Sequence, residues 1–241
     1  MAKKNAFQIA IDGPVAAGKG TVSRLVADQL GFLYVDTGAM YRATALLGIR
    51  NKINLNDEAA LLPLIQKADI VLKNPTKKEK DGRLATVLID GEDVSWAIRT
   101  VEVSQGSSQV AVHPKIRQEL VNKQQKIAQN TDVIMEGRDI TFRVLPDADL
   151  KIFLTANETI RATRRHFELL TKGVNTTFEE VLSELKQRDD RDYHRAVDPL
   201  QQTPDAWVID SSDLPIERVV EFIVAKVKIM RDKNNLTNHK A

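Results

Sequence analysis

One short stretch near the start of the chain limits its fold more than any other feature. Residues 13–21 read GPVAAGKGT, between an apolar run at residues 7–11 and a series of apolar residues at helical spacing. A glycine-rich turn between a strand and a helix presents successive backbone N–H groups to a ligand, and the helix dipole there also favours an anion. The stretch therefore predicts a phosphate-binding loop within an α/β fold.

This loop departs from the usual pattern, G-x-x-x-x-G-K followed by Ser or Thr, at one position. Gly13, Gly18 and Lys19 match, but Gly20 stands in the place of the hydroxyl residue and Thr21 comes one position later. In the strict motif that hydroxyl binds the metal directly, so the metal ligands are unknown from the sequence. Lys19 is expected to reach the β- and γ-phosphates of a nucleotide. The candidate ATP-binding residues are Gly13, Pro14, Val15, Ala16, Ala17, Gly18, Lys19, Gly20 and Thr21.

Short apolar runs alternate with helical patterns along most of the chain. This alternation predicts a parallel sheet with helices on its faces, its strands at residues 7–11, 32–35, 132–135, 150–154 and 207–209. Between the second and third strands the rhythm changes to a helix at residues 57–68, a strand at 70–72 and a hairpin around Asp90-Gly91, which indicates a small α+β insert. A charged helical region with a break at Lys172-Gly173 and a final amphipathic helix at residues 215–231 follow.

The changes of pattern divide the chain into four parts. We expect a core of residues 1–53, 130–156 and 197–232, an insert of residues 54–129, a charged helical part of residues 157–196 and a flexible tail of residues 233–241.

Charge and composition exclude several classes of protein. The formal net charge of +2 is too near neutral to indicate nucleic acid or an anionic membrane as a partner. The chain contains no cysteine, which excludes disulfides and thiolate metal sites. The N-terminal segment resembles neither a signal peptide nor a membrane span, and no later apolar run is long enough to cross a bilayer. We expect a cytoplasmic protein that binds neither nucleic acid nor membrane.

Three charged clusters are candidates for the site that binds the acceptor of a transferred phosphoryl group. One follows the second predicted strand, with Asp36, Thr37 and Arg42, and another, Arg138-Asp139, follows the third. The third cluster places Arg188, Arg191, Asp192 and Arg195 on one face of a helix, and Arg161, Arg164 and Arg165 precede it. Each cluster also has a structural reading, as a helix cap, a self-paired turn or a solvated helix surface. A phosphate loop nearby favours the functional reading, because phosphoryl transfer concentrates negative charge that arginines stabilise.

Several motifs occur in one order along nearly the whole chain: IAIDGP..AGKGT, LGFLYVDTGAMYRA, SSQVA.HP.IR, EGRDI, VLPDADLKIFLTA and RDDRD..RAV.PL. In these motifs the chain resembles the bacterial-type cytidylate kinases, nucleoside monophosphate kinases of the P-loop class. The resemblance implies a three-layer P-loop core, a monophosphate-binding insert and a closing lid formed by the charged helices. It further implies transfer of the γ-phosphoryl group of ATP, with Mg²⁺, to CMP or dCMP, giving ADP and CDP or dCDP, in pyrimidine nucleotide metabolism. We expect a monomer.

The resemblance also implies roles for individual residues. Ser108, Arg117 and Asp139 would contact the cytosine. Thr37, Arg42 and Arg138 would hold the acceptor phosphate. Arg188 and Asp192 would contact the sugar, and Arg195 would approach the transferring phosphoryl group. The implied catalytic residues are Lys19, Arg188 and Arg195.

The cytosine assignment has a chemical rationale. Cytosine presents an amino donor beside two acceptors, so that a carboxylate and a guanidinium can read it together. Uracil would instead turn an acceptor oxygen toward Asp139 and be disfavoured.

The chain departs from the family pattern at Thr141-Phe142-Arg143, where the family usually has Gly-Thr-Val. Loss of the glycine would remove a turn with positive φ, and Arg143 would bring a new cation close to the site.

Two other functions stay open at this point. The chain could be another P-loop kinase with a small acceptor, or a nonenzymatic protein that binds nucleotide or nucleic acid through its basic helices. A GTPase is disfavoured, because residues 51–54, NKIN, lack the aspartate of the guanine-binding motif.

Overall fold

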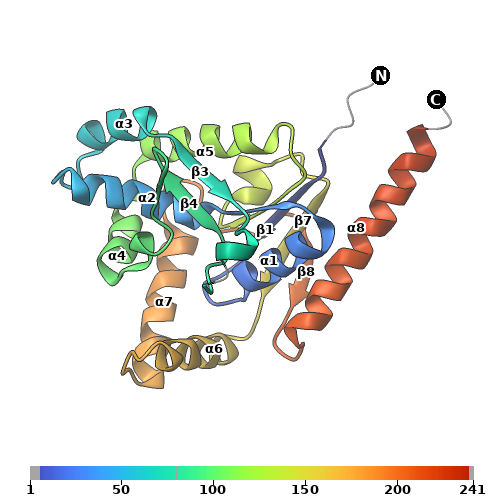
Figure 1. Cartoon of the computed structure of the whole chain (residues 1–241). Helices are drawn as coiled ribbons and strands as arrows, with labels where there is room; N and C mark the ends of the chain where they lie inside the picture. The colour runs from blue at the N-terminus through green and yellow to red at the C-terminus, as the bar shows by residue number, and fades with distance from the viewer. Residues whose placement is uncertain (1–5, 80, 239–241) are drawn as a thin grey trace.

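A five-stranded parallel sheet forms the centre of the computed structural model, which describes residues 6–79 and 81–238 (Figure 1). Its strand order is β2-β6-β1-β7-β8, and all neighbours pair in parallel. The strands are β1 (Gln8–Asp12), β2 (Leu33–Asp36), β6 (Val133–Gly137), β7 (Leu150–Thr155) and β8 (Trp207–Asp210). The α/β class and all five predicted strands are confirmed, with the strand ends shifted by at most two residues.

Helices cover both faces of this sheet, which explains why its strands are apolar throughout. Successive residues of β1 point to opposite faces: Ile9 and Ile11 pack in one hydrophobic core, and Ala10 packs in the other. The first core lies beside α1 (Lys19–Leu30) and α8 (Ile216–Asn238). The second lies beside α2 (Thr37–Arg50) and α5 (Pro114–Ala128). This packing fixes the carboxyl ends of the strands, where the predicted site lies.

Between α2 and α5 the chain forms a second, antiparallel sheet of order β3-β4-β5. Its hairpin turns at Asp90-Gly91, where both residues have positive φ (51° and 86°), as a tight turn requires. The predicted helix, strand and hairpin of this region are therefore confirmed. The elements are α3 (Glu58–Lys67), β3 (Ile70–Lys73), η1 (Lys77–Glu79), β4 (Thr86–Ile89), β5 (Glu92–Asp93), η2 (Ala97–Arg99) and α4 (Val101–Val110).

Two charged helices, α6 (Glu158–Thr171) and α7 (Phe178–His194), pack against each other below the sheet in Figure 1. The chain reverses at Gly173, whose φ is 76°, and α7 begins with a capping box between Thr177 and Glu180. The predicted break at Lys172-Gly173 is confirmed.

The last helix is longer than its apolar pattern indicated. α8 continues to Asn238, although the sequence predicted an end near Arg231 and a flexible tail from residue 233. Residues 232–238 contain neither glycine nor proline, so nothing in them stops the helix. The remaining residues of the predicted tail, 239–241, lie outside the described residues.

Candidate active site

A cavity of about 730 Å³ opens at the carboxyl ends of β1, β2 and β6. This edge of a parallel sheet is where α/β folds bind ligands. Its wall is formed by the loop before α1, the start of α2, the turn between α4 and α5, the end of β6 and the helix α7.

Most of the predicted site residues line this one cavity, although they come from distant parts of the chain. These are Ala16, Ala17, Gly18, Lys19, Gly20, Thr21, Thr37, Arg42, Ser108, Arg117, Arg138, Asp139, Arg188, Asp192 and Arg195. The first three residues of the predicted loop, Gly13, Pro14 and Val15, are not part of the lining.

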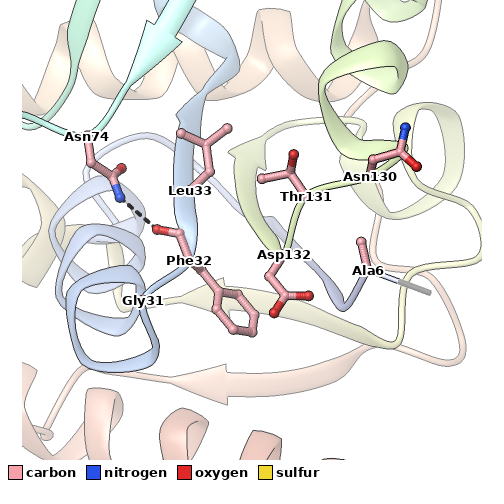
Figure 2. A pocket seen from close by; sticks show the side chains of 8 residues that line it. All are labelled: Ala6, Gly31, Phe32, Leu33, Asn74, Asn130, Thr131 and Asp132. Atoms are coloured by element: carbon pink, nitrogen blue, oxygen red, sulfur yellow. Dashed lines mark hydrogen bonds between the residues drawn. The ribbon is translucent and has the colours of Figure 1, made fainter. Parts of the chain in front are cut away.

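A second hollow, of about 590 Å³, lies around the amino ends of β2 and β6 (Figure 2). Two of its polar side chains, Asn74 and Asp132, form hydrogen bonds within the fold. The Asn74 amide donates to the Phe32 carbonyl at 2.7 Å and accepts from the Tyr34 N–H at 2.9 Å. Asp132 accepts from the Phe7 N–H at 2.7 Å. These contacts stabilise loops, and the hollow contains none of the predicted site residues.

The glycine-rich loop is shaped by backbone contacts. A Cβ on Gly13 would lie 2.0 Å from the Leu154 carbonyl oxygen, so only glycine fits there. Gly18 is left-handed, with φ of 88°, and α1 begins after it without a side-chain cap. The first N–H groups of α1 therefore have no side-chain partner, as a helix N-terminus that binds phosphate requires.

Lys19 is directed into the loop itself. Its Nζ donates to the carbonyl oxygens of Gly13 and Pro14, both at 2.8 Å, and the side chain is buried. Burial lowers the pKa of Lys19 to about 7, and the positive charge of Arg138 adds to the shift. The lysine ammonium therefore lies within the curve of the glycine-rich loop, where it binds the loop carbonyls.

Two buried residues of the charged helices hold Val15 of the loop. Asp189 accepts from the Val15 N–H at 3.1 Å, and Arg161 donates to the Val15 carbonyl at 3.0 Å. Arg161 and Asp189 also form an ion pair at 2.6 Å. Sequence reasoning did not single out Asp189, because it stands in a run of charges where its exposed neighbour Asp190 has the same side chain.

At the start of α2 the structural reading of the first charged cluster is confirmed for Asp36, whereas Arg42 is paired rather than solvated. Asp36 caps the helix by accepting from the Ala39 N–H at 3.0 Å, and it also pairs with Arg42 at 2.6 Å. Burial opposes the charged form of Asp36, but Arg42 and Arg99 nevertheless hold the pKa of this carboxyl below its usual value. Thr37 donates its hydroxyl to the Glu136 carbonyl at 2.8 Å.

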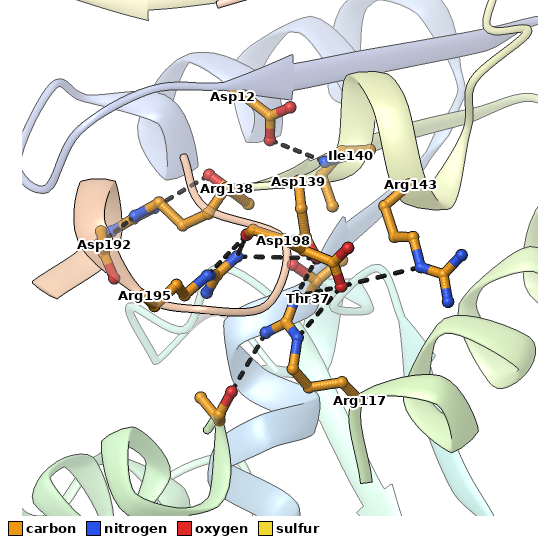
Figure 3. Close-up of polar contacts among 12 residues, drawn as sticks. Asp12, Thr37, Arg117, Arg138, Asp139, Ile140, Arg143, Asp192, Arg195 and Asp198 are labelled. Atoms are coloured by element: carbon orange, nitrogen blue, oxygen red, sulfur yellow. Dashed lines mark hydrogen bonds and ion pairs between the residues drawn. The ribbon is translucent and has the colours of Figure 1, made fainter. Parts of the chain in front are cut away.

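The turn after β6 provides two further contacts. Arg138 pairs with Asp192 of α7 at 2.6 Å, and this links the end of β6 to the charged helices. Asp139 forms a buried ion pair with Arg117 of α5 (Figure 3). Burial raises the pKa of Asp139, while the nearby Arg117 opposes the rise. Ser108 of α4 lines the same cavity.

Two residues of the segment after α7, Arg195 and Asp198, contact the Arg117–Asp139 pair. The sequence analysis did not predict a role for Asp198. Its carboxylate lies 3.2 Å from Arg117 and 3.7 Å from the new cation Arg143 (Figure 3). Arg195 donates to the Asp198 carbonyl and lies 3.8 Å from Asp139. Asp198 has a left-handed backbone, with φ of 46°, which is uncommon for a residue other than glycine.

The departure at Thr141 is accommodated without a glycine. Residues Ile140–Val144 form a short π-helical turn, and Thr141 is not among the residues with positive φ, so the backbone of this chain needs no glycine at that position. Its N–H and hydroxyl donate to Asp12 at 2.8 and 2.7 Å, and the Ile140 N–H donates to the same carboxylate at 3.0 Å. Burial raises the pKa of Asp12 to about 6, although these hydrogen bonds oppose the rise.

Comparisons with known proteins agree on one family. The family model described as cytidylate kinase matches residues 9–229. A cytidylate kinase of Geobacillus sp. (strain WCH70) is 44% identical over 221 residues, which cover 92% of this chain and 96% of that protein. A cytidylate kinase of Pelotomaculum thermopropionicum is 46% identical over 228 residues, which cover 94% of this chain and 99% of that protein.

A solved structure is similar in fold alone. An uncharacterized protein from Eubacterium ventriosum aligns with a TM-score of 0.51 and 12% identity, over 92% of this chain and 98% of its own. Within the described part of the chain, no helix has both the length and the apolar character needed to span a membrane.

Proposed function

This chain belongs to the cytidylate kinase family, and we propose which of its residues perform the phosphoryl transfer from ATP to CMP or dCMP. The enzyme is an ATP-dependent nucleoside monophosphate kinase. The observation that carries the proposed site is that the buried Arg117–Asp139 pair lines the same cavity as Lys19 of the phosphate loop. One cavity can thus hold a cytosine at one end and the donor phosphates at the other.

The donor end would bind ATP mainly through the loop backbone. N–H groups at the start of α1 are available to the phosphates, and Lys19 would leave the carbonyls of Gly13 and Pro14 to contact them. Because a phosphate is a stronger partner than two neutral carbonyls, the charged form of Lys19 would be favoured on binding.

At the acceptor end Thr37, Arg42 and Arg138 would hold the CMP phosphate, and Arg188 and Asp192 the sugar. Ser108, Arg117 and Asp139 would read the base. The acceptor phosphate oxygen is already a nucleophile, so catalysis consists of positioning and charge stabilisation, to which Lys19, Arg188 and Arg195 contribute.

Magnesium fits this cavity as an ion bound chiefly to the nucleotide. Among the described residues no group of three or more His, Cys, Asp or Glu forms a metal cluster. Mg²⁺ usually keeps several waters and takes one or two carboxylates beside the substrate phosphates. Asp36 and Glu136 both line the cavity, and Glu136 lies within electrostatic reach of Lys19. These two carboxylates would hold the ion, which would neutralise phosphate charge when bound.

The division of the chain follows from these roles. We propose that residues 1–53, 130–156 and 197–232 form the P-loop core, residues 54–129 the monophosphate-binding insert and residues 157–196 the lid. Within these ranges, residues 1–5 and 80 lie outside the described residues. Closure of the lid would exclude water, which otherwise competes with CMP for the phosphoryl group. We further propose that the enzyme acts as a monomer in the cytoplasm and binds no nucleic acid.

ADP release, measured in a coupled assay with and without CMP, tests this function. We expect release that depends on CMP and that is lost in Lys19→Met. ATP hydrolysis at the same rate with and without CMP would contradict the proposed function.

A further inference from the structure

Asp198, in the segment after α7, contacts two arginines of the proposed site with two different groups. Its carboxylate accepts from the Nε and Nη2 atoms of Arg117, at 3.3 and 3.2 Å. Its backbone carbonyl accepts from the Nε atom of Arg195 at 2.6 Å (Figure 3). Both arginines line the cavity, whereas Asp198 is not part of the lining. One residue outside the lining thus holds both the arginine proposed to read the base and the arginine proposed to approach the phosphoryl group.

Arg117 is buried, so the orientation of its guanidinium depends on the groups that accept its N–H bonds. Nη2 donates to the carboxylates of both Asp139 and Asp198. Nε donates to Asp198 as well, and Nη1 donates to the Ala111 carbonyl at 3.3 Å. Because a guanidinium is a rigid planar fork, acceptors on several of its nitrogens fix its plane. Asp198 provides two of these bonds.

The contact with Asp198 also bears on how Asp139 is used. Arg117 and Arg195 both approach Asp139 at the same carboxylate oxygen, Oδ2. Among the described residues, no hydrogen bond or ion pair involves the other oxygen, Oδ1. A guanidinium without a second acid favours the bidentate pair, in which both carboxylate oxygens are occupied. With Asp198 present, Oδ1 of Asp139 stays available to a donor on the ligand.

Arg143 brings a charge opposite to that of Asp198. Its Nε atom lies 3.7 Å from the Asp198 carboxylate, and its side chain also donates to Gln118 of α5. Position 143 departs from the family pattern, which usually has valine there, and the motif RAV.PL leaves position 198 open. Two carboxylates on one guanidinium repel each other, and a further cation offsets this repulsion. The two positions outside the pattern thus form a charge pair beside Arg117.

We propose that Asp198 is a positioning residue for base selection, which holds the Arg117 guanidinium so that Asp139 keeps one oxygen for the amino group of cytosine. The inference rests on the proposed function and adds to it a residue that touches no substrate. The selected ligand is a nucleoside monophosphate whose base presents an amino donor, and UMP is the competitor that lacks it. Because Asp198 acts through Arg117, its effect on selection must disappear when Arg117 is absent.

Asp198→Gly and Asp198→Asn test this role without disturbing the backbone. The φ of Asp198 is 46°, and Gly and Asn adopt this left-handed conformation more readily than other residues. Both variants keep the carbonyl that binds Arg195 and remove the carboxylate charge. In steady-state kinetics with Asp198→Gly, we expect the ratio of kcat/KM for CMP over UMP to fall about tenfold, mainly through the KM for CMP, with the KM for ATP unchanged. Asp198→Asn keeps a neutral acceptor and should give a smaller loss.

Arg117→Met shows whether Asp198 acts through the arginine. In the Arg117→Met background, Asp198→Gly should lower the preference for CMP no further, because the group that it positions is already lost. Asp205→Asn is the matched control. Asp205 is exposed and paired with Lys151 at 2.6 Å outside the cavity lining, so its replacement should leave the preference unchanged. Thermal unfolding shows which variants are folded, and the two Asp198 variants decide the question if Arg117→Met is unstable.

Two results would overturn the proposal. One is an unchanged ratio of CMP to UMP in both folded Asp198 variants, which would reduce the residue to a role in the turn. The other is an equal further loss from Asp198→Gly when Arg117 is absent. A wild type that transfers no phosphoryl group to CMP would instead contradict the proposed function itself. A selective wild type with unaffected Asp198 variants would contradict this inference alone.

Discussion

The two ends of the cavity are built by different physical means. At the donor end the groups offered to the ligand belong to the backbone of a contiguous loop, and the single lysine binds that loop's own carbonyls. At the acceptor end they are side chains that pair across the fold. Arg117 of α5 meets Asp139 after β6, and Arg138 meets Asp192 of α7. The donor end is therefore shaped by local conformation and the acceptor end by tertiary packing.

This difference has a consequence for ligand binding. Under the proposed assignment, phosphates at the donor end would displace only the contacts of Lys19 with two loop carbonyls, whereas an acceptor would have to fit a network of charges that is already paired. Such paired charges resist replacement, because removing one partner leaves the other buried and uncompensated. The donor end should thus tolerate many triphosphates, while the acceptor end selects the base.

The largest expected effect is a loss of the rate of phosphoryl transfer without a loss of ATP binding at the donor end. Lys19→Met should lower the rate of transfer on the order of a thousandfold, because a positioned cation is lost where charge develops. The backbone N–H groups remain, so ATP should still bind. Steady-state kinetics and ATP titration measure the two effects, and a variant with near-normal turnover would contradict the role of Lys19.

A smaller effect is expected where the lid helices hold the donor loop. Asp189→Ala removes the acceptor of the Val15 N–H and leaves Arg161 unpaired, so the free energy of unfolding should fall by about 3 kcal/mol and the KM for ATP should rise. Glu158→Gln, which breaks an exposed pair with Lys186 between the same helices, is the control, with an effect below about 1 kcal/mol. Equal effects in urea unfolding would show that the contact with Val15 is unimportant.

Thr141→Val tests the link between the strand before the loop and the turn after Asp139. Loss of the hydroxyl bond to Asp12 should lower stability by about 1 kcal/mol. The pKa of Asp12 is raised to about 6 in the folded protein, so its ionisation lowers stability as pH rises from about 4 to 6. Without the hydroxyl the carboxylate is less stabilised. The difference between variant and wild type should therefore be larger at pH 7 than at pH 4, and a difference independent of pH would argue against this origin.

The smallest expected effect is the uptake of less than one proton for each ATP that binds. Since burial lowers the pKa of Lys19 to about 7, the lysine is largely neutral at pH 8, and the phosphates of ATP should restore its charge. ATP binding at pH 8 should then take up protons, which calorimetry in two buffers of different ionisation enthalpy measures. At pH 5.5 the lysine is already charged and contributes no uptake. Lys19→Met should show less uptake at pH 8 than the wild type, and an equal uptake would exclude Lys19 as its source.

The same difference between the two ends explains what the sequence could predict. The donor loop and the five strands follow from local patterns, and they are found where these patterns place them. Ser108 and Arg117 could be assigned only through the family resemblance, because a serine and an arginine on amphipathic helices carry no local signal. Asp189 and Asp198 escaped prediction because the residues that they contact come from distant parts of the chain. For Thr141 the sequence analysis considered only the loss of the family's glycine. Its hydrogen bond to Asp12 could not be predicted, because the two residues are far apart in the sequence.

The central claim is that Arg117 and Asp139 select the base, and a panel of acceptors tests it most directly. We compare the kcat/KM for CMP, dCMP, UMP, AMP and GMP in the wild type and in Asp139→Asn, whose amide can donate to uracil. The wild type should prefer CMP or dCMP, and the variant should lose at least about tenfold of the preference for CMP over UMP. A wild type that phosphorylates UMP or AMP faster than CMP, or a ratio unchanged by Asp139→Asn, would contradict the account.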